Sequence, residues 1–269
     1  MTFRTFEVSD PSLSPPGLQF VTVKSAVLHQ RADVTIYLPP EFKHLRDVPI
    51  VTLLHGVYGS HWAWTYQGGA HLTAGELMRQ GAIKPMVLVM PSDGLWGDGS
   101  GYVAHPNQDF ERWIVKEVPE LALRACTACS SDSPRFIAGL SMGGFAALRL
   151  AGQYPGHYQA ASAHSALTDM SQIDALIEES RANWASEPSN TSVLEALRGA
   201  RHLPALRLDC GKSDALLSAN RQLHQSLLDL GIAHDYEEFE GGHDWHYWRG
   251  HLANSLRFFS RTLEQLPHD

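Results

Sequence analysis

The chain has 269 residues, of which 43% are hydrophobic, and it carries a formal net charge of −8 at pH 7. The length suits a single globular domain over residues 1–269, and the acidic balance without a Lys- or Arg-rich run argues against nucleic acid and anionic membrane surfaces as partners. No apolar run is long enough to span a membrane, the first residues lack a signal-peptide pattern, and three cysteines make no disulfide framework, so a cytoplasmic protein is expected.

The N-terminal part of the chain predicts an arm followed by a pair of edge strands. Residues 1–17 are polar and interrupted by prolines, which predicts a loosely attached arm. Residues 19–28 and 32–38 are rich in Val, Ile and Thr, and predict an antiparallel pair at one edge of a sheet. Pro39 and Pro40 end the second strand.

The rest of the chain alternates between buried strands and helices. Short apolar runs typical of strands buried on both faces occupy residues 50–54, 85–90, 135–139, 160–163 and 205–208, and residues 233–239 form the last predicted strand. Helical patterns lie between them, over residues 72–80, 109–126, 144–154, 214–230 and 244–263. This alternation predicts an α/β fold with a mostly parallel central sheet, helices on both faces and antiparallel N-terminal edge strands.

One long insertion interrupts this alternation at residues 168–203. Short helices are predicted in it around residues 173–184 and 192–198. The insertion follows a predicted strand, so it could overhang a site at the carboxyl ends of the strands.

The strand at residues 135–139 leads into Gly-Leu-Ser-Met-Gly at residues 139–143, which matches the G-x-S-x-G pattern of a nucleophile elbow. A serine in such a turn has a strained backbone, and Gly139, Gly143 and Gly144 leave room where strand and helix nearly collide. The helix N-terminus beneath it favours developing negative charge. Ser141 is therefore the predicted nucleophile, and the alternative is a glycine-rich connection with an incidental serine.

A nucleophilic serine needs a base and an acid that orients the base. In an α/β-hydrolase they follow the serine in the order Asp or Glu, then His. Asp214 lies beyond a strand end and is favoured over Asp209, which lies within or at the end of the strand, although Asp214 could instead cap a helix. His243 follows two glycines in the loop after the last strand and is the predicted base, with His246 as its nearest rival.

Acyl transfer also needs hydrogen-bond donors for the oxyanion. The backbone N–H of Met142, next to the predicted nucleophile, is one candidate. The second is expected in the His-Gly loop of residues 54–60, where the N–H of Val57 is favoured and that of Tyr58 is the alternative. The same glycines would also suit a simple turn without a catalytic role.

Aromatic residues follow the oxyanion loop and the next buried strand, and one lies in the insertion. They could line an acyl pocket or stack on a sugar or aryl group. Cys126 and Cys129 form C-x-x-C, but no further ligands at matching spacing accompany them, so no metal and no cofactor are expected. The candidate pocket residues are Trp62, Trp64, Tyr66, Trp96, Tyr102 and Trp184.

With these motifs in order, the chain resembles the α/β-hydrolase esterases grouped around esterase D, which include S-formylglutathione hydrolases, tributyrin-type esterases, feruloyl and acetyl esterases, and mycolyltransferases. The resemblance implies a triad of Ser141, Asp214 and His243 and an oxyanion hole of the Val57 and Met142 amides. It also implies that two tryptophans pack behind the histidine loop, Trp245 and Trp248. The matching stretches are YLPP (37–40), LLHGVYGS (53–60), PMVLVMPSDG (85–94), GLSMGGFAALRLA (139–151), CGKSD (210–214) and GGHDWHYW (241–248).

The resemblance is closer to the tributyrin-type and feruloyl or acetyl esterases than to the formylglutathione branch. That branch usually has a Cys-bearing S-G-L-T-C loop where this chain has H-G-V-Y-G-S, which argues against glutathione thioesters as substrates. We therefore expect a serine carboxylesterase that hydrolyses a small-molecule ester, of short-chain acyl or aryl type and including sugar esters, through an acyl-enzyme on Ser141. The alternatives are an acyltransferase with the same triad and a catalytically silent binding protein. The resemblance also allows a homo-oligomer.

Overall fold

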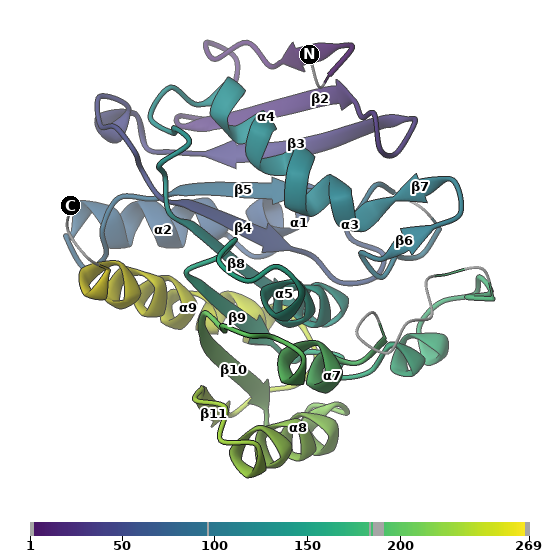
Figure 1. Cartoon of the computed structure of the whole chain (residues 1–269). Coiled ribbons are helices and arrows are strands. Elements are labelled where there is room, and N and C mark those ends of the chain that lie inside the picture. Colours follow the sequence, from purple (N-terminus) through teal and green to yellow (C-terminus); the bar gives the residue numbers. More distant parts are fainter. Residues whose placement is uncertain (1–2, 96, 183, 185–190, 267–269) are drawn as a thin grey trace.

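The computed structural model describes residues 3–95, 97–182, 184 and 191–266, and its main feature is one large sheet (Figure 1). Along the sheet the strands follow the order β1, β2, β3, β5, β4, β8, β9, β10, β11. The pairs within the first four strands of this order are antiparallel and the remaining pairs are parallel. In sheet order the strands are Phe6–Val8, Leu18–Lys24, Arg31–Tyr37, Val87–Pro91, Ile50–Leu54, Arg135–Leu140, Ala160–His164, Ala205–Gly211 and Asp235–Phe239.

The central strands are buried on both faces, as their apolar runs predict. All five residues of β4 and all five of β5 are buried, and Leu54 at the end of β4 lies opposite Gly139 in β8. On the other side of β8, Leu140 lies opposite His164 in β9. This register places the turn after β8 between the loops that follow its two neighbours, so all three segments meet at the carboxyl edge of the sheet.

Helices cover both faces of the sheet (Figure 1). On one face, α2 (Ala70–Arg79) and α9 (Trp245–Gln265) enclose a core that includes Phe136 and Phe259. On the other face, a second core around Trp113 and Phe145 lies beneath the remaining long helices. These are α3 (Phe110–Arg112), the π-helical turn η2 (Trp113–Glu117), α4 (Val118–Ala125), α5 (Met142–Gln153), α7 (Val193–Arg198) and α8 (Leu217–Asp229). The predicted sheet with helices on both faces and antiparallel N-terminal strands is confirmed.

The N-terminal arm is more ordered than the sequence predicts. Phe6 pairs with Val23, so β1 adds a strand to the sheet edge. The guanidinium of Arg124 in α4 lies 4.1 Å from the ring centroid of Phe6, and Phe3 is buried. The prediction of a loose arm was wrong because it weighed prolines and polar residues, whereas two phenylalanines bury apolar area here.

The insertion contains less helix than predicted. The 3-10 helix η3 spans Met170–Ala175, and no described residue from 176 to 182 is helical. The backbone there is bonded elsewhere, because the N–H of Glu178 donates to Oδ2 of Asp98 at 2.8 Å. The second predicted helix is present as α7, and residues 183 and 185–190 lie outside the described part.

Short elements that the sequence does not signal complete the chain. Two-residue strands β6 (Ala104–His105) and β7 (Gln108–Asp109) form a hairpin before α3. The 3-10 turn η1 (Pro40–Phe42) and the single turn α1 (Ala63–Tyr66) follow β3 and β4.

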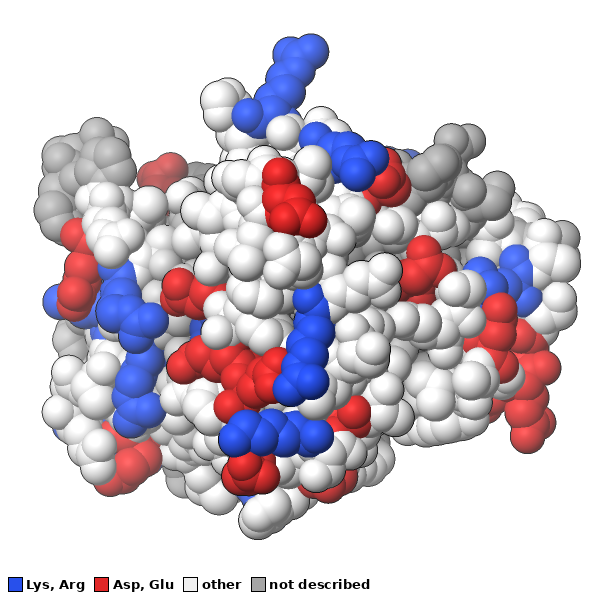
Figure 2. Space-filling view, turned by 90° about the horizontal axis from the view of Figure 1, so that it is seen from below, with Lys and Arg blue, Asp and Glu red and all other residues white. Residues whose placement is uncertain are grey.

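Charged side chains of both signs are interspersed on the face at the β11 end of the sheet (Figure 2). Around that edge, Arg221 pairs with Glu238 and Lys212 pairs with Glu240, each at 2.7 Å. Such mixing differs from the one-sided basic surface that nucleic acid requires. No helix in the described part of the chain combines the length and apolarity that crossing a bilayer demands.

Candidate active site

Ser141 occupies a strained turn between β8 and α5. Its φ of 54° and ψ of −120° are rarely adopted by a residue with a side chain. A Cβ on Gly139 would overlap the carbonyl oxygen of Gly143, and one on Gly143 would overlap that of Leu54. The backbone of Ser141 is held from both sides, since its N–H donates to the carbonyl of His164 at 3.0 Å. The glycines predicted to make room for this turn are thus required by its geometry.

One imidazole links Ser141 to a carboxylate. Nε2 of His243 lies 3.0 Å from Oγ of Ser141, and its Nδ1 lies 2.9 Å from Oδ2 of Asp214. A carboxylate only accepts hydrogen bonds, so Nδ1 carries the proton and donates it, which leaves Nε2 to accept from the serine hydroxyl. The arrangement can therefore move a proton from Ser141 to His243.

The loops after β10 and β11 bring the acid and the base together. The N–H of Ser213 donates to the carbonyl of Gly241 at 2.9 Å, and a Cβ on Gly211 would overlap that same carbonyl oxygen. Asp214 itself closes the turn, because its Oδ1 accepts the N–H of Leu216 at 2.8 Å. The helix-capping role foreseen for Asp214 and its contact with the histidine are thus compatible.

Asp214 is held as a carboxylate. Burial raises the pKa of its carboxyl group, but the hydrogen bonds from His243 and from the N–H of Leu216 outweigh burial, so the pKa lies below its ordinary value. At neutral pH the carboxylate is ionised and can stabilise a positive charge on His243.

The rival residues lie elsewhere. Asp209 is a fully buried residue of β10 that accepts a hydrogen bond from Nδ1 of His164. His246 projects from the first turn of α9 and is exposed. His224 and His234, on α8 and before β11, bond to each other at 2.7 Å. Among these candidates the structure brings Asp214 and His243, and not the rivals, to Ser141.

The loop after β4 lies against the serine. A Cβ on Gly56 would come within 3.3 Å of the Cβ of Ser141, so only glycine allows this approach. The N–H of Tyr58 donates to the carbonyl of Asp98 at 2.7 Å, whereas no hydrogen bond in the described part of the chain uses the N–H of Val57. The N–H of Met142, the first residue of α5, has no acceptor within its helix. Val57 is therefore better placed than Tyr58 to donate to an oxyanion.

A pocket of about 290 Å³ opens beside Ser141. The ring of Trp248 meets the imidazole of His243 edge to face at 5.0 Å, and Trp245 meets Trp248 in the same way at 5.3 Å. The two tryptophans thus pack against the histidine loop and line the pocket as well. The lining consists of Gly56, Val57, Tyr58, Gly59, Ala63, Gln67, Leu140, Ser141, His243, Trp245 and Trp248.

The Esterase family model matches residues 25–259. The chain belongs to the Esterase family. It is 25% identical to an acetyl esterase of Caldicellulosiruptor saccharolyticus, over 89% of this chain and 97% of the relative. A ferulic acid esterase structure matches with a TM-score of 0.75 at 25% identity, covering 91% of this chain and 97% of the other. The structure of FphF, a fluorophosphonate-binding serine hydrolase of Staphylococcus aureus, matches with a TM-score of 0.78 at 20% identity, covering 92% and 99%.

These matches confirm the resemblance to esterases grouped around esterase D and the α/β-hydrolase fold. The protein is a serine carboxylesterase.

The aromatic residues predicted to line the pocket of this esterase lie outside its lining. Trp64 is buried and donates its indole N–H to the carbonyl of Leu54, and Tyr102 is buried with its hydroxyl on the carbonyl of His55. Trp184 stacks on a histidine, and Trp62 and Tyr66 are exposed, while Trp96 lies outside the described residues. The pocket takes its aromatic rings from Trp245 and Trp248 instead. The GGHDWHYW motif contains both, but sequence reasoning assigned them to packing alone.

The insertion reaches the oxyanion loop of the esterase. The exposed Tyr58 donates its hydroxyl to the carbonyl of Leu176, and the N–H of Asp98 donates to Oε2 of Glu179 at 3.2 Å. Desolvation and the carboxylates of Asp98, Glu178 and Glu179 raise the pKa of the Tyr58 phenol. The mouth of the pocket is therefore acidic.

The remaining candidates for a chemical role are the cysteines. Cys126 and Cys129 are buried free thiols, and a hydrogen bond from Cys129 lowers the pKa of Cys126 to about 6. Within the described ranges no cluster of three or more His, Cys, Asp or Glu residues is arranged to hold a metal ion.

Proposed function

We propose that this esterase hydrolyses short-chain acyl or aryl esters, including esters of sugars, through an acyl-enzyme on Ser141. The observation that carries the proposal is the imidazole of His243, which lies 3.0 Å from the serine oxygen and 2.9 Å from the Asp214 carboxylate. This is the spacing at which a base can take the proton of a nucleophile while an acid holds the base.

In the first half of the reaction, Oγ of Ser141 attacks the ester carbonyl carbon and its proton passes to Nε2 of His243. Asp214 stabilises the resulting imidazolium. The N–H groups of Val57 and Met142 donate to the oxyanion, each contributing a few kcal/mol in such sites. The tetrahedral intermediate then collapses, the bond to the alcohol breaks, and the alcohol leaves with the proton from His243.

In the second half, water replaces the alcohol. The side chain of His243 is 28% exposed, so water can reach the acyl-enzyme beside Nε2. The water gives a proton to His243 and attacks the acyl carbon, and collapse of this second intermediate releases the acid and restores the Ser141 hydroxyl. This access to solvent favours hydrolysis over transfer to a second alcohol.

The pocket supports small, uncharged substrates. Its volume of about 290 Å³ is at the lower end for small-molecule sites. Trp245, Trp248 and Leu140 offer apolar surface to an acyl or aryl group, and Gln67 adds an amide that can bond a sugar hydroxyl. The acetyl esterase and the ferulic acid esterase named above carry both kinds of acyl group in their names.

The test is hydrolysis of p-nitrophenyl esters from acetate to decanoate, with methyl ferulate and acetylated xylose alongside, by the wild type and by Ser141→Ala. We expect the highest kcat/KM for short acyl chains, and loss of all activity in the variant. Fluorophosphonate labelling of the wild type but not of the variant checks the nucleophile. Folded wild-type protein that hydrolyses no ester and takes no label would contradict the proposal and revive the silent binding protein.

A further inference from the structure

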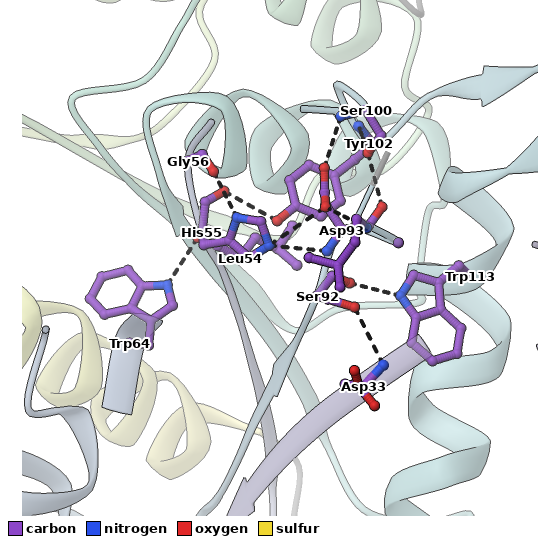
Figure 3. Close-up of polar contacts among 12 residues, drawn as sticks. Asp33, Leu54, His55, Gly56, Trp64, Ser92, Asp93, Ser100, Tyr102 and Trp113 are labelled. Atoms are coloured by element: carbon purple, nitrogen blue, oxygen red, sulfur yellow. Dashed lines mark hydrogen bonds and ion pairs between the residues drawn. The ribbon is translucent and has the colours of Figure 1, made fainter. Parts of the chain in front are cut away.

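His55 is a buried histidine behind the oxyanion loop that the proposed reaction does not use. It follows β4 directly, is 1% exposed and does not line the pocket beside Ser141. Figure 3 shows its ring between the loop of Gly56 and the segment that follows β5. A buried titratable ring needs partners for both nitrogens, and those partners define what it can do.

The partners fix the tautomer of His55. Nδ1 lies 2.7 Å from the carbonyl oxygen of Gly56, which can only accept, so Nδ1 carries the proton. Nε2 lies 3.0 Å from the backbone nitrogen of Asp93, whose N–H can only donate, so Nε2 accepts. His55 is thus held neutral in one orientation, as a donor to the oxyanion loop.

The bond to Gly56 also sets the direction of the next N–H. The carbonyl of Gly56 and the N–H of Val57 belong to one planar trans peptide, in which the two groups point in opposite directions. Because His55 holds the carbonyl on its own side, the N–H of Val57 points away from the imidazole. Val57 lines the pocket, so this is the direction an oxyanion donor needs.

The loop is anchored on both sides of this peptide (Figure 3). The hydroxyl of Tyr102 donates to the carbonyl of His55 at 3.1 Å, and the N–H of Gly59 donates to that of Gly56 at 3.3 Å. A Cβ on Gly59 would lie 2.7 Å from Cγ of His55, so the loop closes tightly around the ring.

The far side of the ring is equally fixed. The carboxylate of Asp93 accepts the N–H groups of Leu95 at 3.0 Å and Ser100 at 2.8 Å, and Oγ of Ser100 donates to the carbonyl of Asp93. This carboxylate, 3.8 Å from Nε2, is the one titratable group of the described residues recorded as an ion-pair partner of His55. The Asp93 N–H that holds Nε2 therefore belongs to a rigid turn.

We infer that His55 is a positioning residue of the oxyanion hole, which aims the N–H of Val57 through its bond to the Gly56 carbonyl. The inference rests on the proposed function, and it assigns a role in the reaction to a side chain that touches no substrate. Removing an oxyanion donor costs about 10²–10³ in kcat. A donor that is present but no longer aimed should cost part of this, about tenfold to a hundredfold.

Two substitutions separate the two ring nitrogens. Asn places its amide near the position of Nδ1 and can still donate to Gly56, whereas Gln reaches the position of Nε2 and loses that donor. We expect His55→Gln to lower kcat for p-nitrophenyl acetate about tenfold to a hundredfold with little change in KM, and His55→Asn to stay within about threefold of the wild type. His61→Gln, a half-buried histidine six residues further on, is the matched control and should leave kcat unchanged.

A second readout reports the oxyanion hole itself. A trifluoromethyl ketone forms a tetrahedral adduct with the serine, so its inhibition constant should rise in His55→Gln by about the factor by which kcat falls. Active sites are counted by fluorophosphonate labelling, so that loss of folded protein is not mistaken for loss of rate. Equal kcat in His55→Gln and His55→Asn, or a change confined to KM, overturns the inference.

A third variant keeps the test open if His55→Gln does not fold. Tyr102→Phe removes only the hydroxyl that holds the carbonyl of His55, and it should lower kcat at unchanged KM, while unchanged kcat counts against the inference. The outcomes also distinguish the two levels of the argument. A wild type that hydrolyses esters through Ser141, with His55→Gln equally active, overturns the positioning role alone. A wild type that hydrolyses nothing overturns both.

Discussion

Asp209 in β10 and Asp214 in the loop after it each hold a histidine, and replacing them one at a time by Asn should separate stability from catalysis. Asp209 is fully buried and accepts from Nδ1 of His164 at 2.8 Å, from the Tyr247 hydroxyl at 2.8 Å and from Arg207. Asp214 is the partner of His243 at the pocket. We therefore expect Asp209→Asn to unfold more easily, and Asp214→Asn to fold and lose its activity.

The pKa of Asp209 gives the size of the first effect. Burial raises this pKa, but the His164 and Arg207 partners outweigh burial and lower it from 3.8 to about 2. A difference of about two units at about 1.4 kcal/mol each corresponds to roughly 2 kcal/mol of stability. The folded pKa is depressed, so this contribution is complete above the unfolded pKa of about 4 and is lost as the pH falls toward 2.

At neutral pH, Asn at position 209 leaves two buried partners without their shared carboxylate. Arg207 keeps its ion pair with Glu237 at 2.6 Å, which places the cost at the lower end for breaking a buried pair, about 3 kcal/mol. At about 2–4 °C per kcal/mol for a chain near this size, Tm should fall by about 6–12 °C. Thermal unfolding followed by circular dichroism at pH 7, and at steps down to pH 3, measures both the shift and its decrease in acid.

Asp214→Asn should change Tm by no more than about 2 °C, because His243 is partly exposed and keeps water as a partner. Its kcat should fall by about 10⁴, the effect of losing the acid that orients the base. The reasoning fails if Asp209→Asn loses kcat by a similar factor at an unchanged Tm, because Asp209 would then be part of the reaction. It fails equally if Asp214→Asn keeps its activity.

Three further substitutions test the elbow, the pocket and its mouth. Gly143→Ala should abolish activity and lower Tm, because its Cβ would overlap the carbonyl of Leu54, and wild-type kcat in this variant would contradict the strained turn. Trp245→Ala should raise kcat/KM for octanoate relative to acetate by enlarging the pocket, and an unchanged acyl preference would place the acyl chain elsewhere. Glu179→Gln should raise kcat/KM for a negatively charged succinate monoester but not for the neutral acetate, which competition between the two esters measures.

The sequence was sufficient to predict the strands and the three residues that meet at Ser141. Continuous apolar runs located β4 and β5, and the G-x-S-x-G turn placed Ser141 between β8 and α5. The positions of Asp214 and His243 followed from chain order alone, because loops after neighbouring parallel strands open on the same edge of the sheet. Their roles in catalysis stay predictions, as do the single domain over residues 1–269 and the homo-oligomer.

The pocket lining could not be predicted in the same way. Trp64 and Trp62 are two residues apart after the oxyanion loop, yet one is buried against Leu54 and the other is exposed. Their directions depend on the single turn α1, which has no periodic signal of its own. Trp245 and Trp248 face the pocket because both lie on the first turn of α9, three residues apart. A motif locates such residues, but the orientation of the helix decides which of them a substrate meets.

Geometry alone does not identify the reactive serine, because this esterase contains a second chain of Ser, His and Asp. Oγ of Ser255 lies 2.8 Å from Nε2 of His164, and Nδ1 of His164 lies 2.8 Å from Asp209, distances as short as those at Ser141. Every member of that second chain is 0% exposed, so no ester or water can reach it. Its function is structural, since the backbone carbonyl of His164 accepts the N–H of Ser141 and fixes the strained turn. The buried pair thus holds the backbone of Ser141, while the partly exposed His243 is the one that can act on its hydroxyl.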